Sequence, residues 1–201
     1  MMKVLLINPP VTFDELFAGG GKEVGGNLPP LGIAYIASYL EKNGIYVKMI
    51  DGMVGNKKVD EIAKMTENFD IVGITSITFF ALRAYEQAAA IKQLYPDRIV
   101  IMGGPHPTAM PEEVLSDKNV DVVVLGEGEI TMLELVKSIE QNGFKNLDKI
   151  DGIAFRKNKK IKINKERKLI FKLDEIPFPA RHLLPINKYF AAEVRSKNHP
   201  A

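Results

Sequence analysis

Residues 99–115 have the sequence Ile-Val-Ile-Met-Gly-Gly-Pro-His-Pro-Thr-Ala-Met-Pro-Glu-Glu-Val-Leu. The apolar run 99–102 is typical of a parallel strand that is covered by helices on both faces. It ends at Gly103 and Gly104, which carry no Cβ atom and let another group approach the backbone closely. Pro111 and the two acidic residues after it predict the first turn of a helix, where proline is tolerated and negative charge is favourable.

The connection between this strand and this helix is rich in proline. Pro105 and Pro107 predict a stiff, irregular loop, because proline donates no backbone hydrogen bond. In an open α/β sheet, ligands bind outside the carboxyl ends of the strands. The glycine pair at such a strand end is therefore a candidate floor for a large, flat ligand.

The rest of the chain repeats this alternation of strand and helix. We expect strands over residues 4–7, 47–50, 70–75, 99–102 and 121–125. We expect helices over residues 31–43, about 59–66, 80–94, from 111 onward and over 131–141. Such alternation predicts a doubly wound, mostly parallel five-stranded sheet with its strand ends at one rim. We expect the flavodoxin-like order 2-1-3-4-5, a Rossmann-like arrangement whose switch point lies between the first and third strands.

The last quarter of the chain has a different pattern. Residues 150–155 and 160–163 predict a β-hairpin with basic residues suited to an exposed edge. Residues 174–181 are punctuated by proline and predict a linker. We therefore expect an α/β domain over 1–148, a hairpin extension over 149–172, and a linker over 173–201 toward a domain that this chain lacks.

Composition narrows the function classes. The 201 residues are 46% hydrophobic, which fits a globular protein with its own core. Eight of the 27 basic residues fall within 156–168, so positive charge does not cover one face as in nucleic-acid-binding domains. The chain has no cysteine and three histidines, which disfavours disulfides, thiolate metal sites and an all-protein metal centre. We see no membrane span or signal peptide, and we expect a cytoplasmic protein without a membrane partner.

Three motifs follow strands that are expected to end at the same rim. They are Asn8-Pro9-Pro10, Ser76-Ile77-Thr78 and Gly103-Gly104-Pro105-His106. The last two resemble the Ser-x-Leu and Gly-Gly elements of cobalamin-binding domains. The wider pattern, from Lys3 to about Tyr189, resembles the amino-terminal B12-binding domain of cobalamin-dependent radical SAM enzymes. The segments that carry this resemblance are Leu5–Pro10, Pro29–Tyr35, Gly103–Thr108, Gly126–Glu129 and Asp174–Arg181.

The resemblance has implications for the cofactor and for the parent enzyme. The Asp-x-His-x-x-Gly motif, which supplies the lower cobalt ligand in many B12 proteins, is absent after the first strand. The resemblance therefore implies base-off cobalamin at the carboxyl ends of the strands. The Cys-x-x-x-Cys-x-x-Cys motif for a [4Fe–4S] cluster is also absent. The resemblance therefore implies that this chain is a domain fragment that is not catalytic alone. Its partner would be a radical SAM domain, which binds S-adenosylmethionine and the [4Fe–4S] cluster. The chemistry implied for the parent enzyme is methyl transfer, ring formation or a related radical reaction.

The resemblance also yields a set of candidate cofactor-binding residues. They are Asn8, Pro9, Pro10, Leu31, Ser76, Ile77, Thr78, Gly103, Gly104, Pro105, His106, Gly126, Glu127 and Gly128. We expect Ser76 and Thr78 to bond the nucleotide tail, although hydroxyl residues there also cap helices. We expect the glycine pair to support the tail base, although it also suits a tight turn. For His106 the alternatives are cobalt, a corrin amide or a phosphate, or a local contact within its loop.

Other candidates have equally local alternatives. Glu127 and Glu129 are placed to contact corrin amides or a partner domain, or to interact with the positive end of a helix. Phe79 and Phe80 fit the core at a helix start better than a ligand contact. An apolar wall facing the upper side of the corrin is expected from Asn8, Pro9, Pro10 and Leu31.

Three other functions suit the same fold. A flavin- or nucleotide-binding domain would use the hydroxyl run after the third strand, but the chain lacks a glycine-rich first loop. A receiver domain needs an acidic pocket, and the third strand ends in Thr75-Ser76 instead. A ligand-free interaction domain is the third alternative. The absorbance spectrum after mixing with hydroxocobalamin separates these functions.

Overall fold

The computed structural model of the protein describes residues 2–11, 27–55 and 57–190. The described part contains a seven-stranded sheet in the order β2-β1-β3-β4-β5-β6-β7. Neighbours from β2 to β5 are parallel, and β6 and β7 are antiparallel additions beside β5. The strands are β1 (Lys3–Asn8), β2 (Tyr46–Asp51), β3 (Ile71–Thr75), β4 (Ile99–Gly103), β5 (Val122–Val124), β6 (Ile153–Lys157) and β7 (Lys160–Ile163).

The flavodoxin-like class and the order of the first five strands are confirmed. The count of five strands is wrong for the sheet as a whole, because the expected hairpin pairs with β5 and continues the same sheet. Its turn places Asn158 and Lys159 at positive φ, the conformation of a two-residue hairpin loop. The domain boundaries expected at residues 148 and 172 stay predictions.

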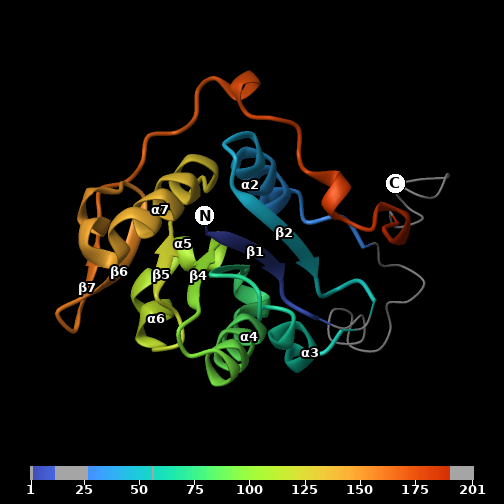
Figure 1. Cartoon of the computed structure of the whole chain (residues 1–201), viewed down its shortest axis with the longest axis horizontal. Helices are drawn as coiled ribbons and strands as arrows, with labels where there is room; N and C mark the ends of the chain where they lie inside the picture. The colour runs from blue at the N-terminus through green and yellow to red at the C-terminus, as the bar shows by residue number, and fades with distance from the viewer. Residues whose placement is uncertain (1, 12–26, 56, 191–201) are drawn as a thin grey trace.

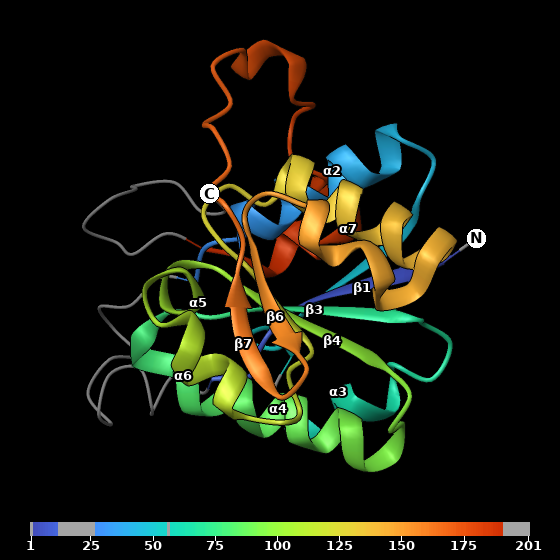
Figure 2. The same ribbon diagram turned by 90° about the vertical axis from the view of Figure 1, so that its left-hand side faces the viewer.

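Helices cover both faces of the sheet (Figures 1 and 2). They are α2 (Leu31–Lys42), α3 (Val59–Lys64), α4 (Ala81–Leu94), α5 (Pro105–Ala109), α6 (Pro111–Ser116) and α7 (Glu129–Asn142). Figure 2 shows α2 and α7 on one face, with α3, α4 and α6 on the other. Short 3₁₀ turns are η1 (Thr78–Phe80), η2 (Gly143–Lys149), η3 (Leu173–Glu175), η4 (Arg181–Leu183) and η5 (Ile186–Lys188).

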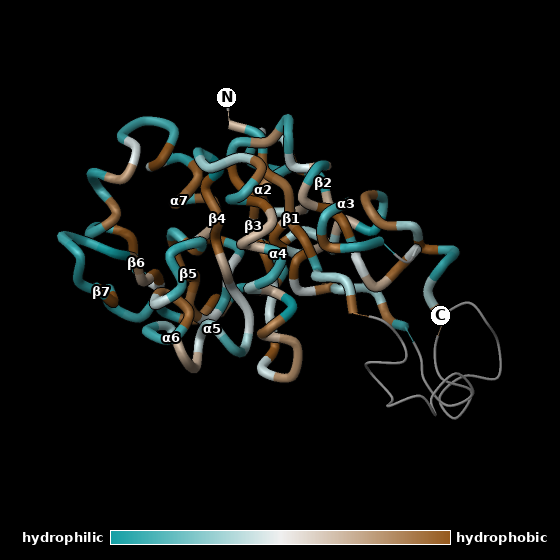
Figure 3. Tube along the Cα trace, turned by 90° about the horizontal axis from the view of Figure 1, so that it is seen from below, coloured by the Kyte–Doolittle hydropathy of each residue, from teal (hydrophilic) through white to brown (hydrophobic). Residues whose placement is uncertain are grey.

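The two faces produce two hydrophobic cores, and β1 illustrates why. Successive strand residues point to opposite faces. Val4 and Leu6 pack in the core beneath α2 and α7, whereas Leu5 and Ile7 pack in the core beneath α3 and α4. Because both sets are buried, the strand needs an apolar residue at every one of these positions. Figure 3 shows hydrophobic residues concentrated along the central strands.

The prediction of an irregular loop at Pro105 and Pro107 is also wrong. These residues form α5, a short helix whose first residue is Pro105. Proline is tolerated in a first turn, because the amide groups there have no partner within the helix. Gly104 precedes the helix with φ of 103°. His106 is consequently a buried helical residue and does not lie in a rim loop.

The segment after the hairpin passes α7 and crosses to α2 (Figure 1). The amide of Ala180 donates a hydrogen bond to the carbonyl of Ala34 at 2.9 Å. Residues 12–26 lie outside the described residues, as do residues 191–201 at the end of the expected linker. In the part that the structure describes, no helix has the length and apolar character needed to cross a membrane.

Candidate functional site

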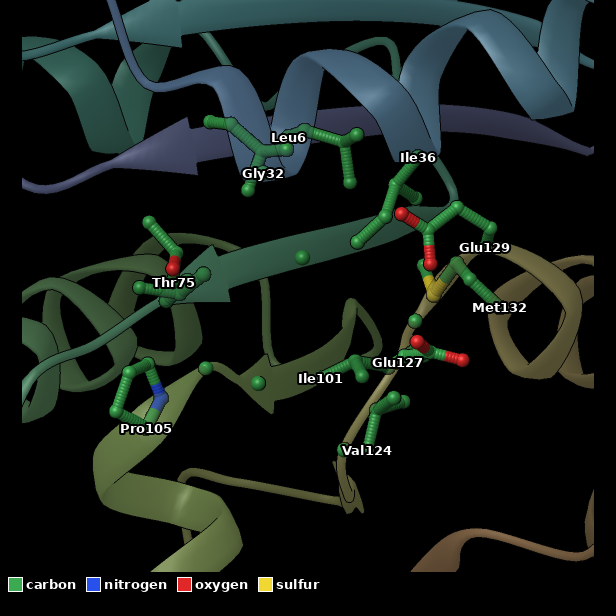
Figure 4. Close-up of a pocket in the computed structure, with 17 residues that line it drawn as sticks. Leu6, Gly32, Ile36, Thr75, Ile101, Pro105, Val124, Glu127, Glu129 and Met132 are labelled. Carbon is green, nitrogen blue, oxygen red and sulfur yellow. The ribbon is translucent and has the colours of Figure 1, made fainter. Parts of the chain in front are cut away.

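A cavity of about 260 Å³ lies at the carboxyl ends of β1, β3, β4 and β5, beneath α2 and α7 (Figure 4). The strands supply aliphatic walls and glycines. Helix α2 contributes Gly32, Ile33 and Ile36, and the start of α7 contributes Glu129 and Met132. The cavity therefore occupies the place where open α/β sheets bind ligands.

The strand tips that form the cavity floor are tied together by backbone hydrogen bonds. Thr75 pairs with Gly103 across β3 and β4. The amide of Ser76 donates to the carbonyl of Gly103 at 2.9 Å, and the amide of His106 donates to the carbonyl of Ser76 at 3.1 Å. Residues 76–78 and 103–106 thus begin side by side at one edge of the sheet.

At two glycines of this cavity, a Cβ atom would be too close to neighbouring atoms. At Gly104 a Cβ atom would lie 2.8 Å from the carbonyl oxygen of Ser76, and φ of 103° further disfavours other residues. At Gly73, in the interior of β3, a Cβ atom would lie 2.7 Å from Cδ2 of Leu6. Glycine is required at both positions because the protein's own atoms already occupy the space that a Cβ atom would take.

The sequence-predicted residues divide between two hollows. The main cavity is lined by Gly103, Gly104, Pro105, Gly126, Glu127 and Gly128. A smaller hollow of about 120 Å³ at the same rim is lined by Asn8, Pro9, Ser76 and Ile77. Within the described residues, neither of these two hollows is lined by Pro10, Leu31, Thr78 or His106.

His106 faces the other side of the sheet. It is buried, and its Nε2 lies 3.2 Å from the hydroxyl of Tyr85 on α4 and 3.8 Å from a carboxylate oxygen of Glu113. Burial, with the charge of Glu113 as a second cause, raises the pKa of Tyr85 to about 12. The imidazole of His106 thus contacts Tyr85 on α4, and not a residue of its own loop as the local alternative predicted.

Asn8 is also engaged locally. Its side-chain amide donates to Asp51 at 2.9 Å, and the other carboxylate oxygen of Asp51 accepts from the hydroxyl of Tyr189 at 2.8 Å. Burial, followed by the charge of Asp51, raises the pKa of Tyr189. This network ties the end of β1 to the segment after the hairpin, a contact that no motif in the sequence indicated.

The two glutamates at the start of α7 have different surroundings. Glu127 accepts a hydrogen bond from the amide of Ile170 at 2.7 Å, so it holds the segment after the hairpin. Glu129 is the first residue of α7 and lines the main cavity beside Ile36 and Met132 (Figure 4). Burial raises the pKa of Glu129 more than hydrogen bonds from nearby backbone amides lower it.

Sequence reasoning missed several residues that line the cavity. They are Leu6, Gly32, Ile33, Ile36, Gly73, Ile74, Thr75, Ile101, Val124 and Met132. Gly73 left a signal, because glycine inside an otherwise β-branched strand often marks a close approach by another group. Among the residues described, no group of three or more His, Cys, Asp or Glu side chains is arranged to hold a metal ion.

Fold and site together define a flavodoxin-like domain with a ligand cavity at its strand ends. Residues 19–136 match the family described as the B12 binding domain, and the chain belongs to this family. This membership confirms the resemblance seen in the sequence.

Known proteins similar to this chain are longer. An uncharacterized methyltransferase, PH0819, of Pyrococcus horikoshii is 39% identical over 194 residues, covering 95% of this chain and 40% of that protein. The anaerobic magnesium-protoporphyrin IX monomethyl ester cyclase of Rubrivivax gelatinosus is 35% identical over 159 residues, covering 77% of this chain and 28% of the cyclase. The chain thus spans 40% or less of either relative.

Solved structures have the same fold. The cobalamin-dependent S-adenosylmethionine radical enzyme OxsB, with aqua-cobalamin and S-adenosylmethionine bound, superposes with a TM-score of 0.73 and 25% identity. The match covers 90% of this chain and 24% of OxsB. The radical S-adenosylmethionine methyltransferase TsrM from Kitasatospora setae superposes with a TM-score of 0.66 at 20% identity, which shows the shared fold.

Proposed function

We propose that this chain holds cobalamin in its base-off form, with the nucleotide tail inserted in the main cavity. The observation that carries the proposal is the cavity itself, enclosed by aliphatic side chains above a glycine floor at the carboxyl ends of four strands. An apolar, flat base suits such walls, because burying it removes apolar surface from water.

The residues around the cavity fit this cofactor. Gly103 and Gly104 provide the floor for the planar base, and Gly73 lines the same cavity. The imidazole of His106 is turned toward Tyr85. This orientation supports base-off binding in which His106 does not take the place of the tail base as a cobalt ligand. When bound, the corrin supplies the cobalt chemistry, and the chain supplies binding and orientation.

The rim beside the cavity is the proposed resting place of the corrin edge. The smaller hollow formed by Asn8, Pro9, Ser76 and Ile77 opens at the same end of the sheet. We keep Pro10, Leu31 and Thr78 as proposed rim contacts, since the larger corrin ring extends beyond a cavity sized for its tail.

We further propose that the parent protein is a radical SAM methyltransferase or a related enzyme. The names of the similar proteins, a methyltransferase and a cyclase, support this class. S-adenosylmethionine and the [4Fe–4S] cluster would be held by a separate radical SAM domain, since this chain has no cysteine. The cytoplasmic location stays a prediction.

The proposal is tested by titrating the protein with hydroxocobalamin and following the visible absorbance. Gly32 lines the cavity, and a Cβ atom at this position would have nothing within 4 Å, so Gly32→Leu adds bulk to the cavity without a clash at its base. We expect this variant to bind at least about tenfold more weakly than the wild type. Ala89→Leu, on the exposed side of α4 across the sheet, is the matched control. Absence of wild-type binding, or equal binding by the Gly32 variant, contradicts the proposal.

A further inference from the structure

We infer that the carboxyl group of Glu129 hydrogen-bonds the benzimidazole nitrogen that becomes free when the tail leaves the cobalt. This inference rests on the proposed function and adds to it the residue that recognises the tail base. It makes Glu129 the polar contact for the tail base in a cavity lined mostly by glycine and aliphatic side chains.

The position of Glu129 singles it out within the cavity wall. It begins α7, and Figure 4 shows its carboxyl group beside Ile36 and Met132. The elements opposite contribute glycine and aliphatic side chains, except for Thr75 at the end of β3 and Pro105. Glu127 also lines the cavity, but its carboxylate accepts the amide of Ile170.

The surroundings of Glu129 shift its pKa upward. Burial raises this pKa, hydrogen bonds from the backbone amides of Glu129 and Gly128 lower it, and the charge of Glu127 raises it. The cation Arg167, which packs against α7, is already engaged with Thr131 and the carboxylate of Glu134. A carboxylic acid in an apolar cavity is a hydrogen-bond donor that requires an acceptor.

The tail base supplies one acceptor of the required kind. A benzimidazole released from cobalt has a single free ring nitrogen, and the remainder of its outer surface is apolar. A purine-type base would bring additional polar atoms that need further partners, and the wall offers few. One polar atom in the ligand therefore requires one polar partner in a wall whose polar side chains are those of Thr75, Glu127 and Glu129.

The contact contains a single proton shared between oxygen and nitrogen. When Glu129 and the nitrogen are both deprotonated, two acceptors face each other and the contact is repulsive. Binding of the tail therefore takes up a proton, and affinity for the tail falls as the pH rises. Glutamine donates from its amide group without any proton uptake.

The test compares cobalamin with cobinamide, which lacks the nucleotide tail, across about pH 5.5 to 8.5. The measured quantity is the ratio of the two affinities, obtained from absorbance titrations. For the wild type we expect the preference for cobalamin to fall by up to about tenfold per pH unit. Glu129→Gln should keep the preference and lose its pH dependence, and Glu129→Leu should reduce the preference about tenfold at the lowest pH. Glu112→Gln, at an exposed position of α6 on the opposite face of the sheet, is the control, with the pH dependence retained.

The outcomes separate this inference from the proposed function. A wild-type preference that does not vary with pH, or a pH dependence that persists in Glu129→Leu, overturns the role of Glu129 while cobalamin binding stands. Binding of neither corrinoid overturns the proposed function itself. Cobinamide affinity reports the integrity of each variant, because cobinamide has no group that reaches the tail cavity.

Discussion

The two faces of the sheet are built from the same strands but differ in what covers them. Beneath α2 and α7, glycines and aliphatic side chains leave a cavity of about 260 Å³. Beneath α3 and α4, the space is filled by fully buried side chains such as Ile62, Ala88 and Ile91. At the rim of this second side, His106 and Tyr85 contact each other.

The difference shows how one scaffold separates stability from binding. A densely packed side contributes burial energy and leaves no room for a ligand. A side with glycine at the strand tips buries less apolar surface and is therefore less stabilising, but it contains a preformed cavity. Substitutions on the packed side should therefore change unfolding, whereas those around the cavity should change binding.

The largest effect is expected where the two sides meet, at Gly104. The change Gly104→Ala forces a residue with a Cβ atom into φ of 103° and places that atom 2.8 Å from the carbonyl oxygen of Ser76. We expect a loss of roughly 3 kcal/mol or more in the free energy of unfolding, measured by urea denaturation.

Gly126→Ala is the matched control for this change. Gly126 also has positive φ, at 66°, but a Cβ atom there would have nothing within 4 Å. We expect it to lose only the backbone term, about 1 kcal/mol. Equal losses in the two variants would show that the close approach of Ser76 does not contribute to the loss of unfolding free energy at position 104.

The second prediction contrasts core positions on the two sides. Ile91, a residue of α4, is fully buried, and Ile91→Ala should lower the free energy of unfolding by about 3 kcal/mol. Its affinity for hydroxocobalamin, measured while folded, should match the wild type. Ile36→Ala, on the cavity wall, should cost about 1 kcal/mol and weaken binding. The comparison fails if Ile91→Ala weakens binding as much as Ile36→Ala.

The sequence predicted the strands and their order because uninterrupted apolar runs alternate with helical patterns throughout the chain. It also located Gly103 and Gly104, since a glycine pair at a strand end is conspicuous. It could not assign each residue to one side of the sheet, because a shift of one position reverses the side that a strand residue faces. Thr75 lines both the main cavity and the smaller hollow, whereas Ser76, the residue predicted, lines only the smaller hollow of the two.

Two other differences have local causes. Pro105 and Pro107 predicted a loop from a rule that holds inside helices, but α5 is so short that its prolines lie in the first turn. Gly32 belongs to a recognised motif, yet its role as an open position on the cavity wall depends on how α2 packs on the sheet. Packing of this kind is set by tertiary contacts that a single motif does not encode.

The smallest effect is expected from the polar contact on the packed side. Tyr85→Phe removes the hydroxyl group that lies 3.2 Å from Nε2 of His106. Nδ1 of the same ring is buried without a hydrogen-bond partner in the described structure, so the change leaves both ring nitrogens unpaired. We expect a loss of about 1–2 kcal/mol near neutral pH with cobalamin affinity unchanged.

The same residue gives this prediction a signature in pH. The pKa of Tyr85 is raised from 10.0 to about 12 in the folded protein, so the folded state retains its hydroxyl proton where the unfolded chain has lost it. The associated stability is fully present below pH 10 and is lost as the pH rises toward 12. The difference in unfolding free energy between wild type and Tyr85→Phe should therefore shrink across this range. Tyr189 is another tyrosine whose pKa is raised by burial, so Tyr189→Phe provides a control background. In this background, adding Tyr85→Phe should still change the unfolding free energy, and that change should still shrink over the same pH range. If Tyr85→Phe instead weakened cobalamin binding at neutral pH, the packed side would take part in binding, and stability and binding would not be separated between the two sides.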